Sequence, residues 1–325
     1  MKSVVKSSDF MSLVQEEMQS VELLMRSQAE DRHPDLESVL NHLLSSGGKR
    51  IRPIVALLSG RMLNADPERL VKLAAAIEML HTATLVHDDL IDGAILRRGI
   101  ATINSQWSPA ATVLTGDFVF ARAAKLAAET DSVTLMRLFA ETLAIIVNGE
   151  LTQLFLSRRV ASRENYDQRI YAKTASLFEL ATTAAALLSP VSEEVVEKMR
   201  CFGYAIGMAF QIVDDILDFT GDQANVGKPV ASDLRQGLIT LPALFYLEAN
   251  PDNPDLNQLL SENYLSETQI SRLVGAIRQS GGIQRSLEVA QAYISQGRQC
   301  FDSFPDNPHR QALDDLARYI VERDF

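Results

Sequence analysis

Apolar residues return every three or four positions along nearly the whole chain, and this helical period restricts the fold more than any other feature. Val14, Met18, Val21 and Met25 give one example. No stretch alternates between apolar and polar residues over the length of a strand. With only 16 Gly and 11 Pro in 325 residues, the chain also lacks the turn residues of a β-rich protein. The sequence therefore predicts an all-α protein, a single large helical bundle.

Local signals divide this pattern into helices without dividing it into domains. The pair Ser108-Pro109 is typical of a helix start. Segment 250–255 is rich in Pro, Asn and Asp and predicts a loop, but the helical pattern resumes after it with the same composition. We therefore expect one domain over residues 1–325. Its catalytic core would cover about 35–245, and accessory helices would cover about 255–325.

Charge and composition exclude several classes of protein. The formal net charge is −11, which argues against nucleic acid as the main partner, because a phosphate footprint needs a positive surface. Cys201 and Cys300 are too few for a disulfide framework or a zinc site. The apolar run 180–188 is too short for a membrane span, and the N-terminal residues show no secretory signal. We expect a cytoplasmic protein without a stable membrane span.

Two segments share the pattern Asp-Asp-x-x-Asp inside the same aliphatic frame. Residues 85–92 read LVHDDLID, and residues 211–218 read QIVDDILD. On a helix, the first and last Asp lie one turn apart on one face, where stacked like charges are unfavourable. Mg²⁺ would compensate, because it binds carboxylates, water and phosphate oxygens. A solvated acidic face explains one copy equally well, but two copies with apolar flanks favour a metal cluster between facing helices, with diphosphate as the remaining ligand.

Basic residues occur where a diphosphate site would need them. Segment 46–53 is a Gly-containing loop before a helix that carries Lys49, Arg50 and Arg52. Such a loop can bind phosphate through backbone N–H groups and guanidinium groups, although a solvated basic turn has the same composition. The other candidates, each weak alone, are Arg97, Arg98, Lys173, Thr174, Lys228 and His81, for which an ordinary core histidine is the alternative.

In combination, these motifs resemble the trans-isoprenyl diphosphate synthases, the all-α polyprenyl synthase family, and in particular its medium- and long-chain members such as heptaprenyl, octaprenyl and solanesyl diphosphate synthases. The resemblance covers nearly the whole chain and is clearest from Val39 to Thr240. The segments that carry it are GGKRIRP (47–53), HDDLID through RRG (87–99), GD (116–117), GELTQ (149–153), KTA (173–175), GMAFQ (207–211) and GKP (227–229).

The resemblance implies a Mg²⁺-dependent prenyltransferase that joins isopentenyl diphosphate head-to-tail, in trans, to an allylic diphosphate such as farnesyl or geranylgeranyl diphosphate. It also implies a homodimer. By this resemblance the metal ligands would be Asp88, Asp92 and Asp214, supported by Asp89, Asp215 and Asp218. The allylic diphosphate would contact Arg97, Lys173 and Lys228. The diphosphate of isopentenyl diphosphate would contact Lys49, Arg52, His81 and Arg98. Thr174 and Gln211 would lie beside the developing carbocation.

The same resemblance bears on product length. In short-chain relatives, bulky residues ahead of the first Asp motif stop chain growth. Here Ala83 occupies the fifth position before Asp88, and Ala75 and Ala76 lie about two turns deeper. An open tunnel would give a product longer than geranylgeranyl, with a floor formed by Phe139, Leu143 or Met79.

Other functions remain open at this point. A short-chain farnesyl or geranylgeranyl synthase would share all the motifs. A terpene cyclase normally lacks the second Asp motif and the Lys49/Arg52 site, and a non-catalytic subunit of a heteromeric synthase usually loses Asp motifs. The dipeptide His87-Asp88 also occurs in HD phosphohydrolases, where the second motif has no role. A di-iron bundle would need Glu-x-x-His pairs near the Asp motifs. Many relatives carry Lys near position 238, where this chain has Leu238.

Overall fold

A computed structural model describes residues 10–28, 38–39, 41–43, 48–97, 99–155, 162–221, 230–262 and 265–323. The secondary-structure elements, in chain order, are a 3₁₀ turn Ser12–Val14, α2 (Gln15–Ser27), α4 (Ile51–Met62), α5 (Pro67–Ile91), β1 (Leu96–Arg97), β2 (Ile100–Ala101), α6 (Ile103–Gln106), α7 (Pro109–Ala128), α8 (Val133–Phe155), α9 (Arg163–Ile170), a π-helical turn Tyr171–Ala175, α10 (Ser176–Leu187), α11 (Glu193–Thr220), α13 (Ser232–Arg235), α14 (Leu241–Ala249), α15 (Pro254–Glu262), α16 (Glu267–Gln279), α17 (Gly282–Gln299) and α18 (Pro308–Glu322).

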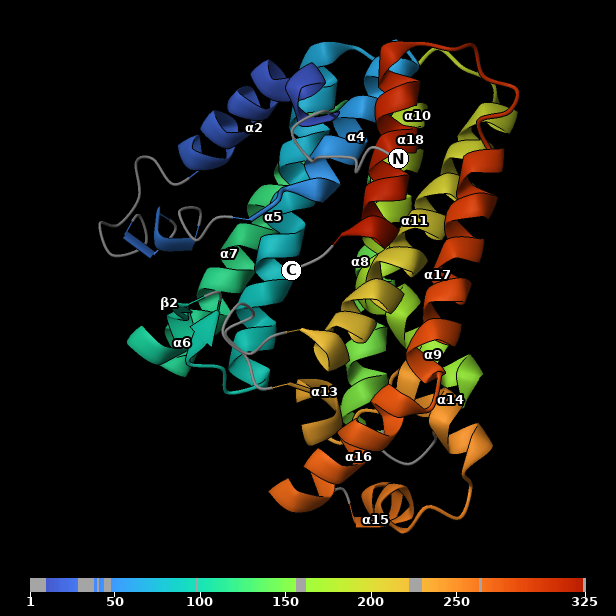
Figure 1. Cartoon of the computed structure of the whole chain (residues 1–325). Coiled ribbons are helices and arrows are strands. Elements are labelled where there is room, and N and C mark those ends of the chain that lie inside the picture. The colour runs from blue at the N-terminus through green and yellow to red at the C-terminus, as the bar shows by residue number, and fades with distance from the viewer. Residues whose placement is uncertain are drawn as a thin grey trace.

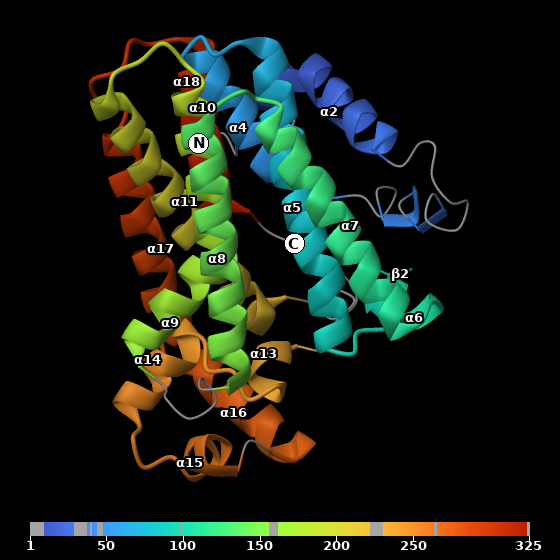
Figure 2. The same ribbon diagram turned by 180° about the vertical axis from the view of Figure 1, so that it is seen from behind.

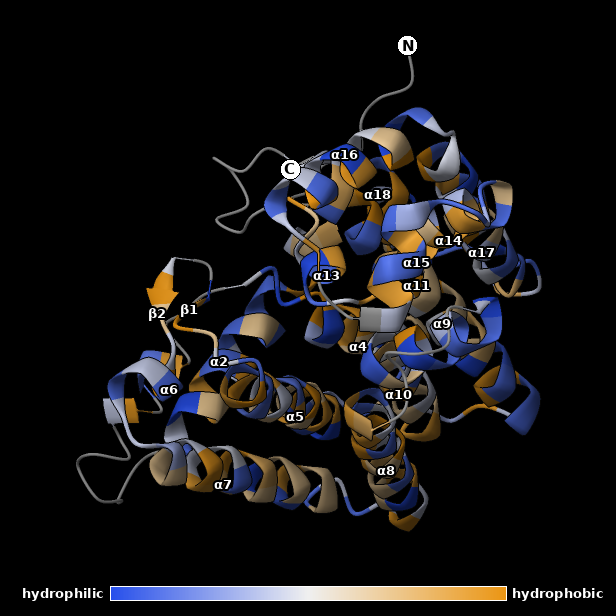
Figure 3. Ribbon diagram, turned by 90° about the horizontal axis from the view of Figure 1, so that it is seen from below, coloured by the Kyte–Doolittle hydropathy of each residue, from blue (hydrophilic) through white to orange (hydrophobic). Residues whose placement is uncertain are grey.

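The long helices form one bundle, which confirms the predicted all-α class. In Figures 1 and 2, α5 lies beside α7 on one side and α11 lies beside α17 on the other. The shorter α4 and α10 pack between these pairs, and α18 packs against α4, α11 and α17. The view in Figure 3 shows α7 at one edge, with α5 between it and the rest of the bundle. The two helices that carry the Asp motifs, α5 and α11, therefore belong to opposite parts of the bundle.

Several helix boundaries follow the sequence signals. Ser108 caps α7 by accepting a hydrogen bond from Ala111 N–H at 3.2 Å, with Pro109 in the first helical position. Asp131 separates α7 from α8 in the left-handed conformation, with φ 53°. The only sheet in the described ranges is a two-stranded antiparallel ribbon that pairs Leu96 with Ala101 and Arg97 with Ile100. This ribbon is too short for a periodic pattern to reveal.

Two helices bear on the expectation that the chain has no stable membrane span. By length and composition alone, α5 and α8 are both apolar enough to cross one. In α5 the apolar window is 67% buried, so the composition reflects a core helix; in α8 it is only 17% buried. The uninterrupted apolar runs are short because scattered Thr, Glu and Arg residues divide them, but these residues do not lower the mean hydropathy of either helix far.

Helix α11 approaches α10 and the π-helical turn through two glycines one helical turn apart. A Cβ atom at Gly203 would lie 2.2 Å from Thr182 Oγ1, and one at Gly207 would lie 2.5 Å from Ala175 Cα. No side chain fits at either distance, so these positions require glycine. The close approach brings the next turn of α11, which carries Gln211, against the segment that carries Thr174.

Candidate active site

A cleft of about 780 Å³ lies between the two parts of the bundle, where both Asp motifs meet. The end of α5 contributes Asp88 and Asp89, and α11 contributes Gln211 and Asp214. The remaining wall includes Gly48, Lys49, Arg52, His81, Arg97, Lys173, Thr174, Phe210 and Arg323. The structure thus brings together acidic and basic residues that lie far apart in the sequence, as the two-motif interpretation predicts.

Asp88 lies deep in the cleft among both signs of charge. Its carboxylate is 3.8 Å from Lys173 Nζ, which also donates a hydrogen bond to Glu150 Oε1 at 3.0 Å. Burial raises the pKa of Asp88 to about 6, and the neighbouring carboxylates of Glu150 and Asp92 add to this effect, while Lys173 opposes it. The site therefore holds more negative charge than one lysine compensates.

Lys173 and Thr174 lie in the π-helical turn between α9 and α10. A π turn inserts one residue into the helical ladder, and such turns often occur at functional sites. The Thr174 hydroxyl donates to Gln211 Oε1 at 2.6 Å, and Gln211 Nε2 donates to Asp215 at 2.8 Å. Both residues face the cleft, as predicted for groups beside a reacting carbon.

Asp215 does not belong to the open part of the cleft. Only 3% of it is exposed, and besides Gln211 it accepts a hydrogen bond from the Tyr166 hydroxyl at 2.8 Å. Burial is the main cause that raises the pKa of Asp215, and the nearby Asp233 carboxylate adds to it. Both carboxylate oxygens are thus used inside the protein rather than offered to a ligand.

The other residues of the first motif differ in exposure. Asp89 is 7% exposed, and its two carboxylate oxygens share the single Nε–H of Arg97, at 2.9 and 3.0 Å. Asp92 is the exposed C-cap residue of α5. His87 turns toward α7, where its ring lies against Gly116 and its Nε2 is 3.2 Å from Val113 O. Arg97 is therefore held at the cleft by the first motif itself.

The second motif is engaged by residues that follow it in the chain. Asp214 forms an ion pair with Arg323, which also donates to Phe210 O at 2.9 Å and stacks on the Phe210 ring. Asp218 accepts hydrogen bonds at 3.0 Å from the backbone N–H and the hydroxyl of Ser232. Asp218 therefore anchors the start of α13, whatever else it binds.

The basic loop before α4 is held in place by a buried ion pair. Arg50 adopts the left-handed conformation, with φ 47°, and its guanidinium bonds Glu78 at 2.7 Å, with 14% and 8% of the two side chains exposed. Arg52 lies 3.1 Å from His81 Nε2. Because arginine can only donate, Nε2 of His81 accepts this hydrogen bond and is unprotonated. His81 and Arg52 are thus brought together, as predicted.

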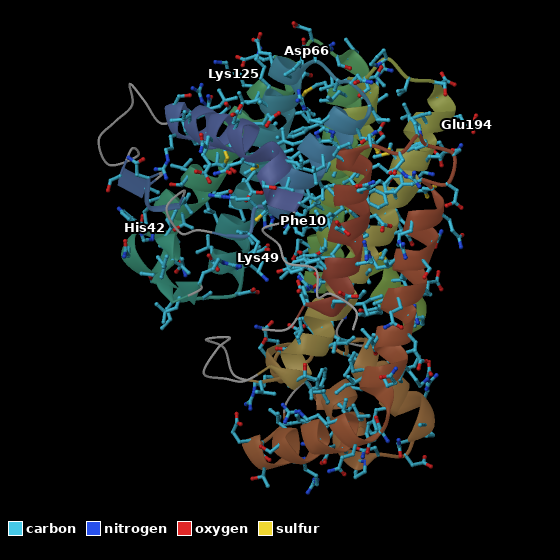
Figure 4. All side chains as sticks on the ribbon, turned by 45° about the horizontal axis from the view of Figure 1, so that its top comes forward. Phe10, His42, Lys49, Asp66, Lys125 and Glu194 are labelled. Carbon is cyan, nitrogen blue, oxygen red and sulfur yellow. The ribbon has the colours of Figure 1, made fainter. Side chains whose placement is uncertain are left out.

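Lys49 reaches across the cleft toward the C-terminal helix. Its Nζ donates to the Tyr319 hydroxyl at 3.1 Å, and Figure 4 shows Lys49 between the ribbons of α5 and α18. Two predicted diphosphate contacts, Arg98 and Lys228, lie outside the described residues. Leu238, which stands where many relatives carry Lys, lies just after α13, and its N–H donates to Asp233 O at 2.9 Å.

Sequence reasoning gave no role to Glu150 and did not consider Arg323 at all. Glu150 belongs to the GELTQ segment, so its motif could have suggested it, and its contact with Lys173 shows that it shares the site. Arg323 is two residues from the C-terminus and belongs to none of the motifs quoted above. Only the packing of α18 against α4 and α11 reveals that it reaches Asp214.

The donor set around Asp88 fits a hard divalent cation. Asp88 and Asp214 line the cleft, and the Asp92 carboxylate is near enough to raise the pKa of Asp88, whose buried carboxylate a cation would stabilise. Among the described residues, no three acidic, His or Cys side chains converge closely enough to hold a metal by themselves. A metal here would complete its coordination with water and diphosphate oxygens, which is the usual behaviour of Mg²⁺.

The residues assigned to a product tunnel lie in the core. Ala83 is 2% exposed, Ala75 and Ala76 are fully buried, and Met79 and Phe139 are 2% and 1% exposed. The cleft reaches the neighbouring Thr82, Thr84 and Leu85. The described cleft thus touches this part of α5, while the tunnel itself stays a prediction.

Comparisons with known proteins agree with this geometry. Residues 33–277 match the family model described as polyprenyl synthetase. The chain is 36% identical to heptaprenyl diphosphate synthase component 2 of Geobacillus stearothermophilus over 97% of this chain and 98% of that protein.

Two solved structures are also similar along nearly their whole length. One is a polyprenyl synthase from Caulobacter crescentus CB15 complexed with calcium and isoprenyl diphosphate, with a TM-score of 0.93, 33% identity and 99% coverage of both chains. The other is a decaprenyl diphosphate synthase from Rhodobacter capsulatus, with a TM-score of 0.91 and 32% identity, covering 98% of this chain and 99% of that one.

Proposed function

This chain belongs to the polyprenyl synthetase family and is a prenyltransferase, and we propose that its cleft binds two diphosphate substrates through different groups of residues. The observation that carries the proposal is that the charged residues of the cleft make separate sets of contacts. Lys173 pairs with Asp88, whereas Arg52 contacts His81 and Lys49 contacts Tyr319. The first group would bind the allylic diphosphate through divalent metal, and the second would bind the diphosphate of isopentenyl diphosphate.

We assign the metal to Mg²⁺, held by Asp88, Asp92 and Asp214, with Asp89 and Asp218 in support. When bound, Mg²⁺ would supply Lewis-acid stabilisation of the departing diphosphate. Lys173 adds a positive charge at the same place, because its Nζ already lies among the carboxylates of Asp88 and Glu150. Although burial lowers the pKa of Lys173, Asp88 and Glu150 raise it, and the net effect is an increase. The lysine is therefore a permanent cation.

The reaction would then proceed by loss of diphosphate from the allylic substrate, with the electron pair leaving on oxygen. The double bond of isopentenyl diphosphate attacks the allylic cation, one C–C bond forms, and one proton is lost to the released diphosphate. Arg52, His81 and Lys49 hold the attacking substrate in place, which removes most of the entropic barrier. Thr174 and Gln211 face the cation with oxygen atoms.

The experiment that tests this function uses purified protein with both substrates and Mg²⁺. We expect polyprenyl diphosphate and inorganic diphosphate to form together, and neither to form from farnesyl diphosphate alone. A chelator should abolish both products, and added Mg²⁺ should restore them. A cyclic hydrocarbon formed from one diphosphate substrate would instead indicate a terpene cyclase.

We further propose that the chain is a homodimer that pairs through α8. Val133, Val147 and Leu154 are 73%, 47% and 48% exposed, and they lie at multiples of seven residues along one face. Exposed apolar stripes of this kind usually mark an interface. A second copy of the chain would cover the stripe symmetrically. The relative named component 2 belongs to a synthase with more than one component, so a different partner is the alternative.

Sedimentation velocity tests the homodimer directly. We expect the sedimentation data to give a mass twice that of one chain, which is 35.9 kDa. The double variant Val147→Glu/Leu154→Glu should sediment as a monomer. Leu23→Glu is the matched control, because Leu23 is 68% exposed but lies on α2. A wild-type monomer would contradict the proposal.

A further inference from the structure

Four side chains form a continuous hydrogen-bonded path from the cleft into the core. Tyr166 donates to one oxygen of Asp215 and Gln211 donates to the other, both at 2.8 Å. Thr174 in turn donates to Gln211 Oε1 at 2.6 Å. Tyr166 and Asp215 are 1% and 3% exposed, whereas Thr174 and Gln211 line the cleft. The buried half of this path has no contact with substrate or metal in the function proposed above.

The direction of these hydrogen bonds has a chemical consequence. Asp215 accepts from both Tyr166 and Gln211 in this arrangement, so it faces the amide N–H₂ of Gln211, and the other end of that amide faces Thr174. The remaining end, Oε1, takes the only proton of the Thr174 hydroxyl. The Thr174 O–H and one N–H of Gln211 are therefore engaged within the path, and the oxygens of Thr174 and Gln211 keep lone pairs for the cleft.

Such an arrangement suits a positive charge and no other ligand. A freely rotating hydroxyl or a flipped amide would present N–H or O–H protons to the cleft, and these would repel a developing cation. The close packing of Gly207 on Ala175 holds the two segments in register, since a Cβ there would lie 2.5 Å from Ala175 Cα. The orientation of both groups is thus fixed before substrate binds, which is the condition for efficient electrostatic stabilisation.

We propose that Tyr166 and Asp215 are positioning residues that orient Gln211 and Thr174 so that their oxygen lone pairs face the allylic cation. This inference rests on the proposed prenyl transfer. It assigns a role to Tyr166, which the motif analysis did not consider. It also replaces the expected metal-supporting role of Asp215 with a hydrogen-bonding role inside the protein.

Tyr166→Phe tests the proposal, because it removes one hydroxyl and keeps the ring. The loss of this buried hydrogen bond should lower the turnover number about tenfold. The KM for isopentenyl diphosphate and the Mg²⁺ concentration at half-maximal rate should stay within twofold of wild type. Tyr246→Phe is the matched control, because its hydroxyl bonds Asn253 at 3.1 Å, away from the cleft.

A binding measurement separates orientation from general damage. An aza analogue of the allylic diphosphate carries a protonated amine where the cation develops, whereas a thiodiphosphate analogue is neutral there. Tyr166→Phe should weaken the aza analogue about tenfold and leave the thiodiphosphate analogue unchanged. A merely structural role would weaken both to the same extent, and that result would overturn the proposal.

A double-mutant cycle shows whether Tyr166 acts through Gln211. The Gln211→Ala variant lacks the amide that Tyr166 is proposed to orient. Adding Tyr166→Phe to this variant should therefore change turnover less than twofold. Additive losses would contradict the proposal, as would unchanged turnover in Tyr166→Phe alone. An increase in the Mg²⁺ requirement would show that Tyr166 supports the metal instead. If the wild-type protein shows no prenyl transfer, the proposed function itself is refuted, and this outcome is distinct from the others.

Discussion

The guanidinium of Arg323 forms an ion pair with the carboxylate of Asp214, the first residue of the second Asp motif. Only 3% of the Arg323 side chain is exposed, and its stacking on Phe210 places it at the wall of the cleft. The last described residue of the chain therefore occupies a carboxylate that the proposed function assigns to Mg²⁺. A metal ion bound as proposed would compete with this guanidinium for Oδ1 of Asp214.

This competition predicts the behaviour of Arg323→Gln. Removing the guanidinium should lower the Mg²⁺ concentration at half-maximal rate by up to about tenfold. A change of this size corresponds to the free energy of one charge-assisted hydrogen bond. The measurement is the initial rate against Mg²⁺ concentration at saturating substrates. Arg318→Gln is the control, because Arg318 lies on the same helix but pairs with Asp314 and Asp315. An unchanged or higher Mg²⁺ requirement would refute the competition.

Asp88→Asn should reduce turnover about 100-fold or more, because a charged ligand at the reacting diphosphate is lost. The same change should remove part of the pH dependence of stability in metal-free protein. The pKa of Asp88 is raised to about 6, so the folded state binds its proton more tightly than the unfolded state. The contribution of Asp88 to stability should therefore be largest below about pH 4 and be lost as the pH rises through about 6. When thermal unfolding is measured with chelator present, the stability of the variant should fall less than that of the wild type as the pH rises. An equal loss would mean that Asp88 does not titrate in this way.

Lys49→Ala should raise the KM for isopentenyl diphosphate about tenfold, because one ammonium contact to its diphosphate is lost. The KM for the allylic substrate should change less than twofold, since Lys173 and the Asp motifs hold that substrate instead. Steady-state kinetics with each substrate varied in turn decides this. Tyr319→Phe keeps the ammonium and removes only its partner hydroxyl, so its effect should be smaller. Equal weakening of both substrates would show that the two sites are wrongly assigned.

Ala83→Phe should shorten the product toward farnesyl or geranylgeranyl length. Position 83 is five residues before Asp88, about 7.5 Å along the helix axis. Because Ala83 is only 2% exposed, the ring should also cost about 1–3 kcal/mol of stability through overpacking. Ala76→Phe lies two turns deeper and should permit longer products than Ala83→Phe. The readout is product chain length together with the thermal midpoint. An unchanged product would show that this face of α5 does not line a tunnel.

The sequence was sufficient to predict the elements and the chemistry that local patterns encode. Helical periodicity predicted the bundle, and the matched Asp motifs predicted that α5 and α11 would face one cleft. The family resemblance assigned Arg52 and His81 to the same diphosphate, and the structure places the two side chains 3.1 Å apart. The division into a core and accessory helices stays a prediction, as do the roles of Arg98 and Lys228.

Other features depend on packing that no local pattern records. Arg323 reaches Asp214 across 109 positions of the chain, and nothing near it in the sequence indicates this contact. The π-helical turn Tyr171–Ala175 has the same apolar spacing as an α-helix over so few residues. Asp215 looks like its neighbour Asp214 in the motif, yet the helix turns it into the core toward Tyr166. Identical residue types in one motif therefore acquired different roles from burial alone.

The most direct test of the account is the chain length of the product made by this chain alone. Purified protein is incubated with Mg²⁺, farnesyl diphosphate and excess isopentenyl diphosphate, and the products are resolved by mass. We predict a ladder of polyprenyl diphosphates that differ by one five-carbon unit and extend beyond geranylgeranyl diphosphate. Growth that stops at geranylgeranyl diphosphate would contradict the long-chain assignment, and no elongation without a second protein would contradict a catalytic homodimer.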